Sequence, residues 1–255
     1  MKAILLASAA LVSITAAAPA IHASAKWVPE SDTIAVGKPI RSVIVMTVDE
    51  GWHTYWTNPG EGGLPLSIKA ELPEGWTLGE IQYPAPIRFM TGELPGFGYE
   101  GEIHFPITLT PSAGAEGKIP PLTATLSWLT CDDSTCLPGK AELTPAKPDS
   151  DLVSDAYAEI PSPIPGAKLT ASVSGDSVDI VLTLPEGSKI DPVAGEVFPA
   201  TRNIIDPAAK PVFVKSGASW KFSAPKSEYL EGKIEALTLI LVSPDKKAWE
   251  LSTVK

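Results

Sequence analysis

Cysteine and histidine are scarce in this 255-residue chain, which contains only two cysteines and three histidines. Finger-type zinc sites need four such ligands in paired spacings. The two cysteines, Cys131 and Cys136, are five positions apart, and no second pair of Cys or His lies near them in the sequence. A zinc finger is therefore excluded, and any chemistry of the cysteines depends on this one pair.

Long apolar runs are also missing beyond the N-terminal stretch, because no later segment reaches the length of a membrane-spanning helix. Residues 1–25 have the features of a signal peptide, with a charged Lys2, apolar residues 3–18 and the small-residue cleavage motif Ala23-Ser24-Ala25. No cysteine follows this motif, so a lipoprotein-type lipid attachment is not expected. We predict an exported protein without direct membrane insertion, in a compartment where disulfides form.

Basic residues are in the minority, with 20 Lys and Arg against 30 Asp and Glu and a net charge of −10. This balance argues against nucleic acids and anionic membranes as partners. Long amphipathic helical patterns are absent as well. Instead, short alternating runs are separated by turn signals, and the 26 prolines and 20 glycines are spread along the chain. This pattern is typical of β-sandwiches.

We therefore predict an all-β protein with two tandem β-sandwich domains, residues 26–148 and 149–255. The boundary is placed in a proline-rich stretch, residues 146–165, where a short helix is expected at 150–159. The second domain has no cysteine and no histidine, so we expect it to be a spacer or a docking module.

The two cysteines flank a turn between two strand-like runs, residues 122–129 and 140–143. Asp132, Asp133, Ser134 and Thr135 favour a bend because their side chains bond to nearby backbone. Cysteines that face each other across such a hairpin have the close approach that a disulfide needs. We expect Cys131 and Cys136 to be bonded. The alternative is a disulfide that only stabilises the fold, but closing so short a loop stabilises the folded state by only about 2 kcal/mol.

Several neighbouring residues are candidate modulators of this pair. His53 could lie near the cysteines, whereas Asp132 and Asp133 are turn formers whose charges would also disfavour a thiolate. The glycine-flanked residues 95–102 are predicted to form a mobile aromatic loop.

The sequence resembles the periplasmic N-terminal domain of the thiol:disulfide interchange protein DsbD, and within that family its ScsB-like branch, which is linked to copper tolerance. The motifs that carry the resemblance are residues 51–60 (GWHTYWTNPG), 83–86 (YPAP), 98–101 (GYEG) and 128–138 (WLTCDDSTCLP). The cysteine spacing differs slightly from the family pattern. The chain also ends at residue 255 without the membrane carrier and the thioredoxin-like domain of full-length members, so a stand-alone form is expected.

The resemblance implies immunoglobulin-like sandwiches and a cysteine pair that cycles between dithiol and disulfide in the periplasm. Electrons would come from a thioredoxin-like or membrane partner and pass to oxidised exported proteins, without a cofactor. Cys136 would form the mixed disulfides and Cys131 would resolve them. An aromatic cap loop shields the pair in this family, and the matching residues here are Phe97, Tyr99 and Glu100.

Two other functions remain open at this point. Cys131 and Cys136, together with His53 or Met90, could hold Cu(I), which prefers soft sulfur ligands. Alternatively, the protein is a non-catalytic interaction module with an inert disulfide. Activity as a component of a protein-disulfide reductase is thus one of three hypotheses.

Overall fold

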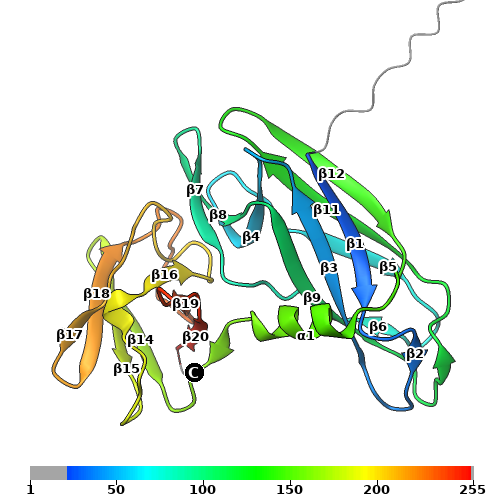
Figure 1. Ribbon diagram of the computed structural model, residues 1–255. Helices are drawn as coiled ribbons and strands as arrows, with labels where there is room; N and C mark the ends of the chain where they lie inside the picture. The colour runs from blue at the N-terminus through cyan, green and yellow to red at the C-terminus, as the bar shows by residue number, and fades with distance from the viewer. Residues whose placement is uncertain (1–21, 254–255) are drawn as a thin grey trace, which may run out of the picture.

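The computed structural model describes residues 22–253, which form two β-sandwiches side by side (Figure 1). The all-β, immunoglobulin-like fold with two tandem domains is confirmed. Most of the expected signal peptide lies outside the described residues, but Ala23-Ser24-Ala25 begin the first strand, β1 (Ala23–Pro29). In the part of the chain that the structure describes, no helix has the length and apolar character needed to cross a bilayer.

The first sandwich packs a sheet of order β1-β3-β9-β6 against a sheet of order β12-β11-β4-β8-β7, in which β5 also pairs with β11. Its remaining strands are β2 (Thr33–Ile34), β3 (Ile40–Val48), β4 (His53–Gly60), β5 (Ser67–Glu71), β6 (Thr77–Leu78), β7 (Ile87–Thr91), β8 (Leu94–Tyr99), β9 (Glu102–Thr110), β10 (Gly117–Lys118), β11 (Thr123–Cys131) and β12 (Cys136–Leu143). The burial of β11 alternates along the strand, because one face points into the core.

The expected helix is present as α1 (Ser150–Ala158), and Asp149 caps its N-terminus by accepting a hydrogen bond from the Leu152 N–H. Val153 and Ala156 of α1 pack against valines on the outer face of β1 and β3. This second contact explains why β3 is apolar on both faces. The helix follows residue 148, yet it packs on the first sandwich (Figure 1).

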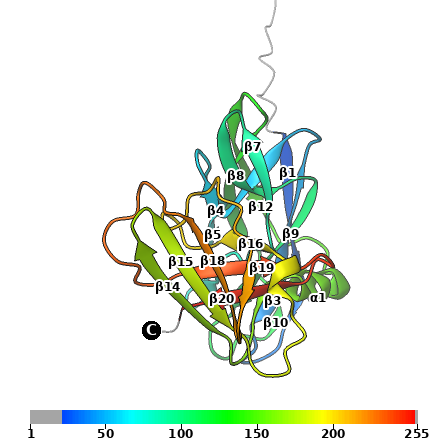
Figure 2. The same ribbon diagram turned by 90° about the vertical axis from the view of Figure 1, so that its left-hand side faces the viewer.

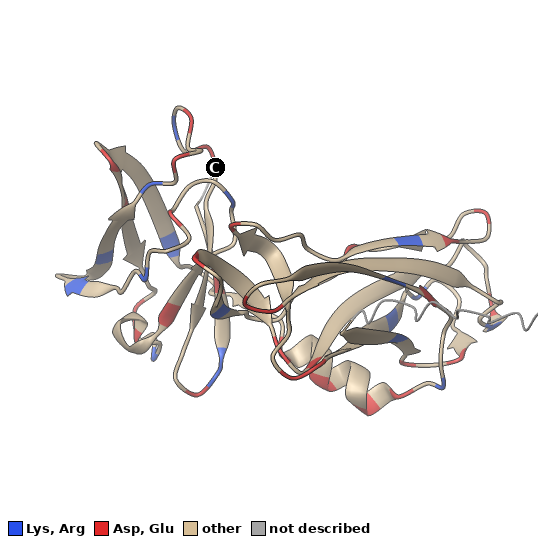
Figure 3. Ribbon diagram, turned by 90° about the horizontal axis from the view of Figure 1, so that it is seen from above, with Lys and Arg blue, Asp and Glu red and all other residues tan. Residues whose placement is uncertain are grey.

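The second sandwich pairs a sheet of order β13-β20-β19-β16 with one of order β14-β15-β18-β17. Its elements are β13 (Ser162–Pro163), β14 (Lys168–Ser174), β15 (Ser177–Thr183), a short 3-10 helix (Pro192–Ala194), β16 (Glu196–Pro199), β17 (Val214–Ser216), β18 (Ser219–Pro225), β19 (Thr238–Val242) and β20 (Ala248–Ser252). Figure 3 shows Lys and Arg scattered singly over both sandwiches among the Asp and Glu residues.

The two sandwiches meet at an interdomain joint, where β4, β7 and β8 of the first contact β16 and the following loop of the second. Asn58 is buried there and donates a hydrogen bond from Nδ2 to the Pro199 carbonyl at 2.7 Å. Arg202 donates from Nε and Nη2 to the Thr57 carbonyl at 3.0 and 2.6 Å. Residues of both sandwiches share one apolar cluster at this joint.

Candidate redox site

Cys131 and Cys136 form a disulfide at the end of the β11–β12 hairpin, as expected from the sequence. They are directly paired across the two strands, with Cα atoms 4.1 Å apart. Asp132 shapes the turn between them, because its Oδ1 accepts hydrogen bonds from the backbone N–H of Ser134 and Thr135 at 2.8 and 2.7 Å. These bonds lower the pKa of the Asp132 carboxyl.

The two cysteines differ in exposure. Cys131 has 0% of its surface exposed, whereas Cys136 is an exposed residue. A partner in thiol–disulfide exchange has to reach a sulfur atom directly. Cys136 is therefore the half of the disulfide that another protein can approach, and Cys131 is the half that the fold covers.

His53 lies in the same row of the sheet as the disulfide, because β4 pairs with β11 at His53 and Cys131. Directly opposed residues in an antiparallel pair point to the same face, so the imidazole is a neighbour of the disulfide. His53 is 5% exposed, and burial lowers its pKa to about 4, although the charges of Asp133 and Asp132 raise it. The ring is therefore neutral at neutral pH.

The hairpin formed by β7 and β8, residues 87–99, packs on His53, the neighbour of Cys131 in this row, and we refer to it as the covering hairpin. Thr91 Oγ1 lies 2.9 Å from His53 Nε2 and 3.4 Å from the Tyr55 hydroxyl, and the Phe89 ring lies 3.7 Å from the imidazole. At the tip, a Cβ built on Gly92 would be 3.6 Å from the Asp133 carbonyl oxygen. Figures 1 and 2 show both hairpins reaching the same end of the first sandwich.

Phe97 and Tyr99 are not in a mobile loop, which corrects the expectation for residues 95–102. Both lie in β8, with 1% and 6% of their surface exposed. Tyr99 donates a hydrogen bond to the Pro84 carbonyl, and Phe97 packs on Trp56 in the core. Glu100 follows β8 at an exposed position. A cap role for these residues stays a prediction, and the burial of both rings gives it no support.

Sequence reasoning missed Phe89 and Thr91 as neighbours of the disulfide. Ile87 and Phe89 alternate with Arg88 shortly before a Gly-Glu turn, which is a weak hairpin signal. The residues proposed for Cu(I) are only partly brought together. His53 adjoins the cysteines, but Met90 lies between Phe89 and Thr91 in β7 and points to the opposite face of that strand.

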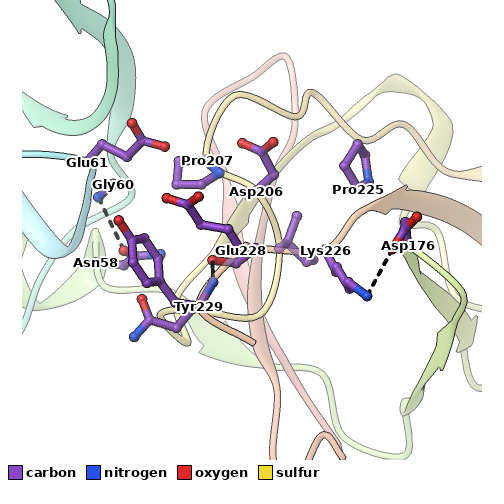
Figure 4. A pocket seen from close by; sticks show the side chains of 13 residues that line it. Asn58, Gly60, Glu61, Asp176, Asp206, Pro207, Pro225, Lys226, Glu228 and Tyr229 are labelled. Atoms are coloured by element: carbon purple, nitrogen blue, oxygen red, sulfur yellow. Dashed lines mark hydrogen bonds and ion pairs between the residues drawn. The ribbon is translucent and has the colours of Figure 1, made fainter. Parts of the chain in front are cut away.

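A separate groove of about 490 Å³ lies at the interdomain joint (Figure 4). Glu61, Asp206 and Glu228 contribute carboxylates to it, and Lys226 in its wall forms an ion pair with Asp176 at 3.0 Å. The groove combines residues of both sandwiches with a polar lining. Its chemistry is distinct from that of the disulfide, and we assign it no part in thiol exchange.

Residues 24–148 match the family model described as thiol:disulfide interchange protein DsbD, N-terminal. Among solved structures, the chain is similar to the crystal structure of the N-terminal periplasmic domain of ScsB from Proteus mirabilis. That similarity has a TM-score of 0.64 and 18% sequence identity and covers 90% of each chain, so it establishes a shared fold across both sandwiches. A comparison with curated protein sequences gave no significant match. Through residues 24–148, which carry the disulfide hairpin, the chain belongs to the DsbD N-terminal domain family.

Proposed function

We propose that the Cys131–Cys136 pair relays electrons in the periplasm, from a thioredoxin-like or membrane partner to oxidised exported proteins. Membership of the DsbD N-terminal family supports thiol–disulfide interchange as the chemistry. The observation that carries the proposal is the contrast between exposed Cys136 and fully buried Cys131. An exchange site needs one sulfur open to a partner and a second sulfur held next to it.

The reductive half of the cycle starts when a thiolate of the partner attacks Sγ of Cys136. The Cys131–Cys136 bond breaks, a mixed disulfide forms at Cys136, and Cys131 leaves as a thiolate that takes up a proton. The second thiolate of the partner then attacks its own mixed-disulfide sulfur and releases Cys136. Two electrons and two protons have then moved from the partner dithiol to this pair.

The oxidative half reverses these roles. The Cys136 thiolate attacks a disulfide in an exported protein and forms a new mixed disulfide, while the other sulfur of that protein leaves as a thiol. Cys131 then attacks Sγ of Cys136, restores the internal disulfide and releases the reduced protein. Cys136 is therefore the cysteine that meets both partners, and Cys131 is the resolving cysteine.

The order of the two cysteines can be tested by trapping the mixed disulfide. A thioredoxin-like protein without its resolving cysteine is oxidised as a mixed disulfide with a small thiol and added to the reduced Cys131→Ser variant. We expect a covalent complex on a non-reducing gel, mapped to Cys136 by mass spectrometry. The matched Cys136→Ser variant should form far less complex. Equal trapping by the two variants would reverse or remove the assigned roles.

A second measurement separates the relay from a structural staple. Structural disulfides of exported proteins typically have reduction potentials below about −300 mV, whereas labile and catalytic ones have higher values. We expect a potential above this limit, determined by equilibration of the purified protein with dithiothreitol buffers. A value well below the limit would assign the disulfide to stabilisation of the fold.

A further inference from the structure

Arg88 connects the covering hairpin to the second sandwich. Its Nη2 donates to the Val197 carbonyl at 2.6 Å and its Nη1 to the Pro207 carbonyl at 3.3 Å. The guanidinium also lies 4.9 Å from the centres of two aromatic rings, Phe97 of β8 and Phe198 of β16. One side chain of β7 is thus held by the backbone and by an aromatic ring of the other domain.

These contacts suit arginine in particular. The planar guanidinium can stack on aromatic rings while its separate N–H groups donate to two acceptors in different directions. A lysine at position 88 would offer a single ammonium group, which can neither stack on the rings in this way nor reproduce the two hydrogen bonds that the separate guanidinium N–H groups donate. The two carbonyl acceptors compensate for the partial burial of the charge.

The opposite face of β7 contacts the surroundings of the disulfide. Side chains alternate along a strand, so Arg88 points to the second sandwich while Phe89 and Thr91 point to His53. The covering hairpin is therefore attached on both faces. We propose that Arg88 is a positioning residue, which holds the covering hairpin against His53, beside Cys131, by anchoring the hairpin to the second sandwich. This gives the second domain a role in controlling access to the disulfide.

The Arg88 anchor should affect the rate of reduction, because reduction places a negative charge on the buried Sγ of Cys131. Attack of a thiolate on Sγ of Cys136 breaks the disulfide and leaves the electron pair on Sγ of Cys131, which then binds a proton. Cys131 is fully buried while the covering hairpin lies on its neighbour His53, and a thiolate is disfavoured where water is excluded. Opening of the hairpin admits water to this sulfur. A looser anchor should therefore speed reduction even by a small reductant.

The test measures the rate at which dithiothreitol reduces the oxidised full chain, followed by alkylation of the released thiols and mass spectrometry. Arg88→Gln removes the guanidinium and retains a polar side chain. We expect reduction about fivefold faster than in the wild type, as the loss of about one net hydrogen bond from the closed state implies. An unchanged rate for Arg88→Gln overturns the proposal.

Arg202→Gln is the matched control. Arg202 also crosses the joint and bonds to a backbone carbonyl, but that carbonyl belongs to Thr57 in β4 and not to the covering hairpin. We expect its reduction rate to stay at the wild-type value. Equal acceleration by the two variants would mean that general loosening of the joint, and not the Arg88 anchor, controls access.

Hydrogen–deuterium exchange distinguishes local opening of the covering hairpin from a general loss of stability. In Arg88→Gln, amides of residues 87–99 should exchange faster while those of β11 keep their protection. If Arg88→Gln does not fold, Phe198→Leu removes one stacked ring from the second sandwich and should give the same local pattern. Uniformly faster exchange in the variant that folds would contradict the anchor. The role of Arg88 rests on the proposed relay for its purpose, but reduction by dithiothreitol needs no protein partner, so a failure of mixed-disulfide trapping would leave these rates unchanged.

Discussion

At the scale of single residues, His53 is a buried base between the disulfide and the covering hairpin. Burial lowers its pKa from 6.5 to about 4. Between these values an unfolded molecule binds a proton that the folded molecule does not, so the free energy of unfolding falls as the pH decreases from 6.5 to 4. At higher pH the ring is neutral in both states and contributes no pH dependence.

Replacement of His53 by Gln should remove this titration and keep a side chain that can bond to Thr91. We expect the loss of stability on acidification to become smaller by on the order of 2 kcal/mol. Urea unfolding of the oxidised protein at neutral and mildly acidic pH measures this difference in the free energy of unfolding. His104→Gln, in β9, is the matched control substitution. The same slope in His53→Gln and the wild type would show that His53 titrates normally.

Asp132 stabilises the turn through its side-chain hydrogen bonds, and comparison of its Ala and Asn variants tests this role. Its Oδ1 accepts two backbone hydrogen bonds, so Asp132→Ala leaves the Ser134 and Thr135 N–H groups to water. We expect a small loss in the free energy of unfolding, because hydrogen bonds on an exposed turn compete with water. Asp132→Asn retains an acceptor oxygen and should lose less. The exposed Asp133 is the control, and an equal loss in Asp133→Ala would show that the turn does not depend on these bonds.

At the scale of elements, the β11–β12 hairpin is fixed to the core through Trp128, which is 4% exposed. Trp128 pairs with Gly139 of β12, and the indole fills the space beside that glycine. A Cβ at position 139 would overlap the ring. The glycine is therefore needed for a close approach between a side chain and the neighbouring strand.

Gly139→Ala should displace the indole and destabilise the hairpin that carries the disulfide. Overpacking of this kind costs about 1–3 kcal/mol, which urea unfolding would detect together with a change in the near-ultraviolet circular dichroism of tryptophan. Lys140→Ala, at the next and exposed position of β12, should have little effect. Wild-type stability in Gly139→Ala would mean that Trp128 has room to move.

At the scale of the whole molecule, the interdomain joint joins the two cores. Phe198 of β16 is 1% exposed, and its ring centre lies 6.0 Å from that of Phe97. Asn58 is also buried and bonds to the Pro199 carbonyl across the joint. Because each sandwich buries part of its surface against the other, we expect the protein to unfold in a single calorimetric transition.

The double variant Asn58→Ala, Phe198→Ala should separate this transition into two. Truncation of a buried phenylalanine costs about 3–5 kcal/mol, which here would come from the contact between the sandwiches. Differential scanning calorimetry measures the outcome. Tyr229→Ala, at a position 62% exposed in the joint groove, is the control and should keep one transition. Two separate transitions in the wild type would show that the joint couples the domains only weakly.

The sequence by itself determined the features that depend on neighbouring residues. The Asp-Asp-Ser-Thr turn between two alternating runs is local, so it predicted the hairpin and the pairing of Cys131 with Cys136. The helix at 150–158 likewise follows from Asp149 at its N-cap and a short stretch of helix-compatible residues. The motifs around the cysteines indicated the family, which the match over residues 24–148 confirmed.

Only the tertiary structure decided which segment packs beside the disulfide, because the contacts involved join residues far apart in the chain. Residues 94–99 have the composition of a loop, yet a Cβ on Gly96 would meet the Phe89 ring and one on Gly98 the Thr54 carbonyl. These glycines permit close packing in a strand and do not mark mobility. The anchor at Arg88 joins residues 109 positions apart, and no local pattern in the sequence specifies such a contact.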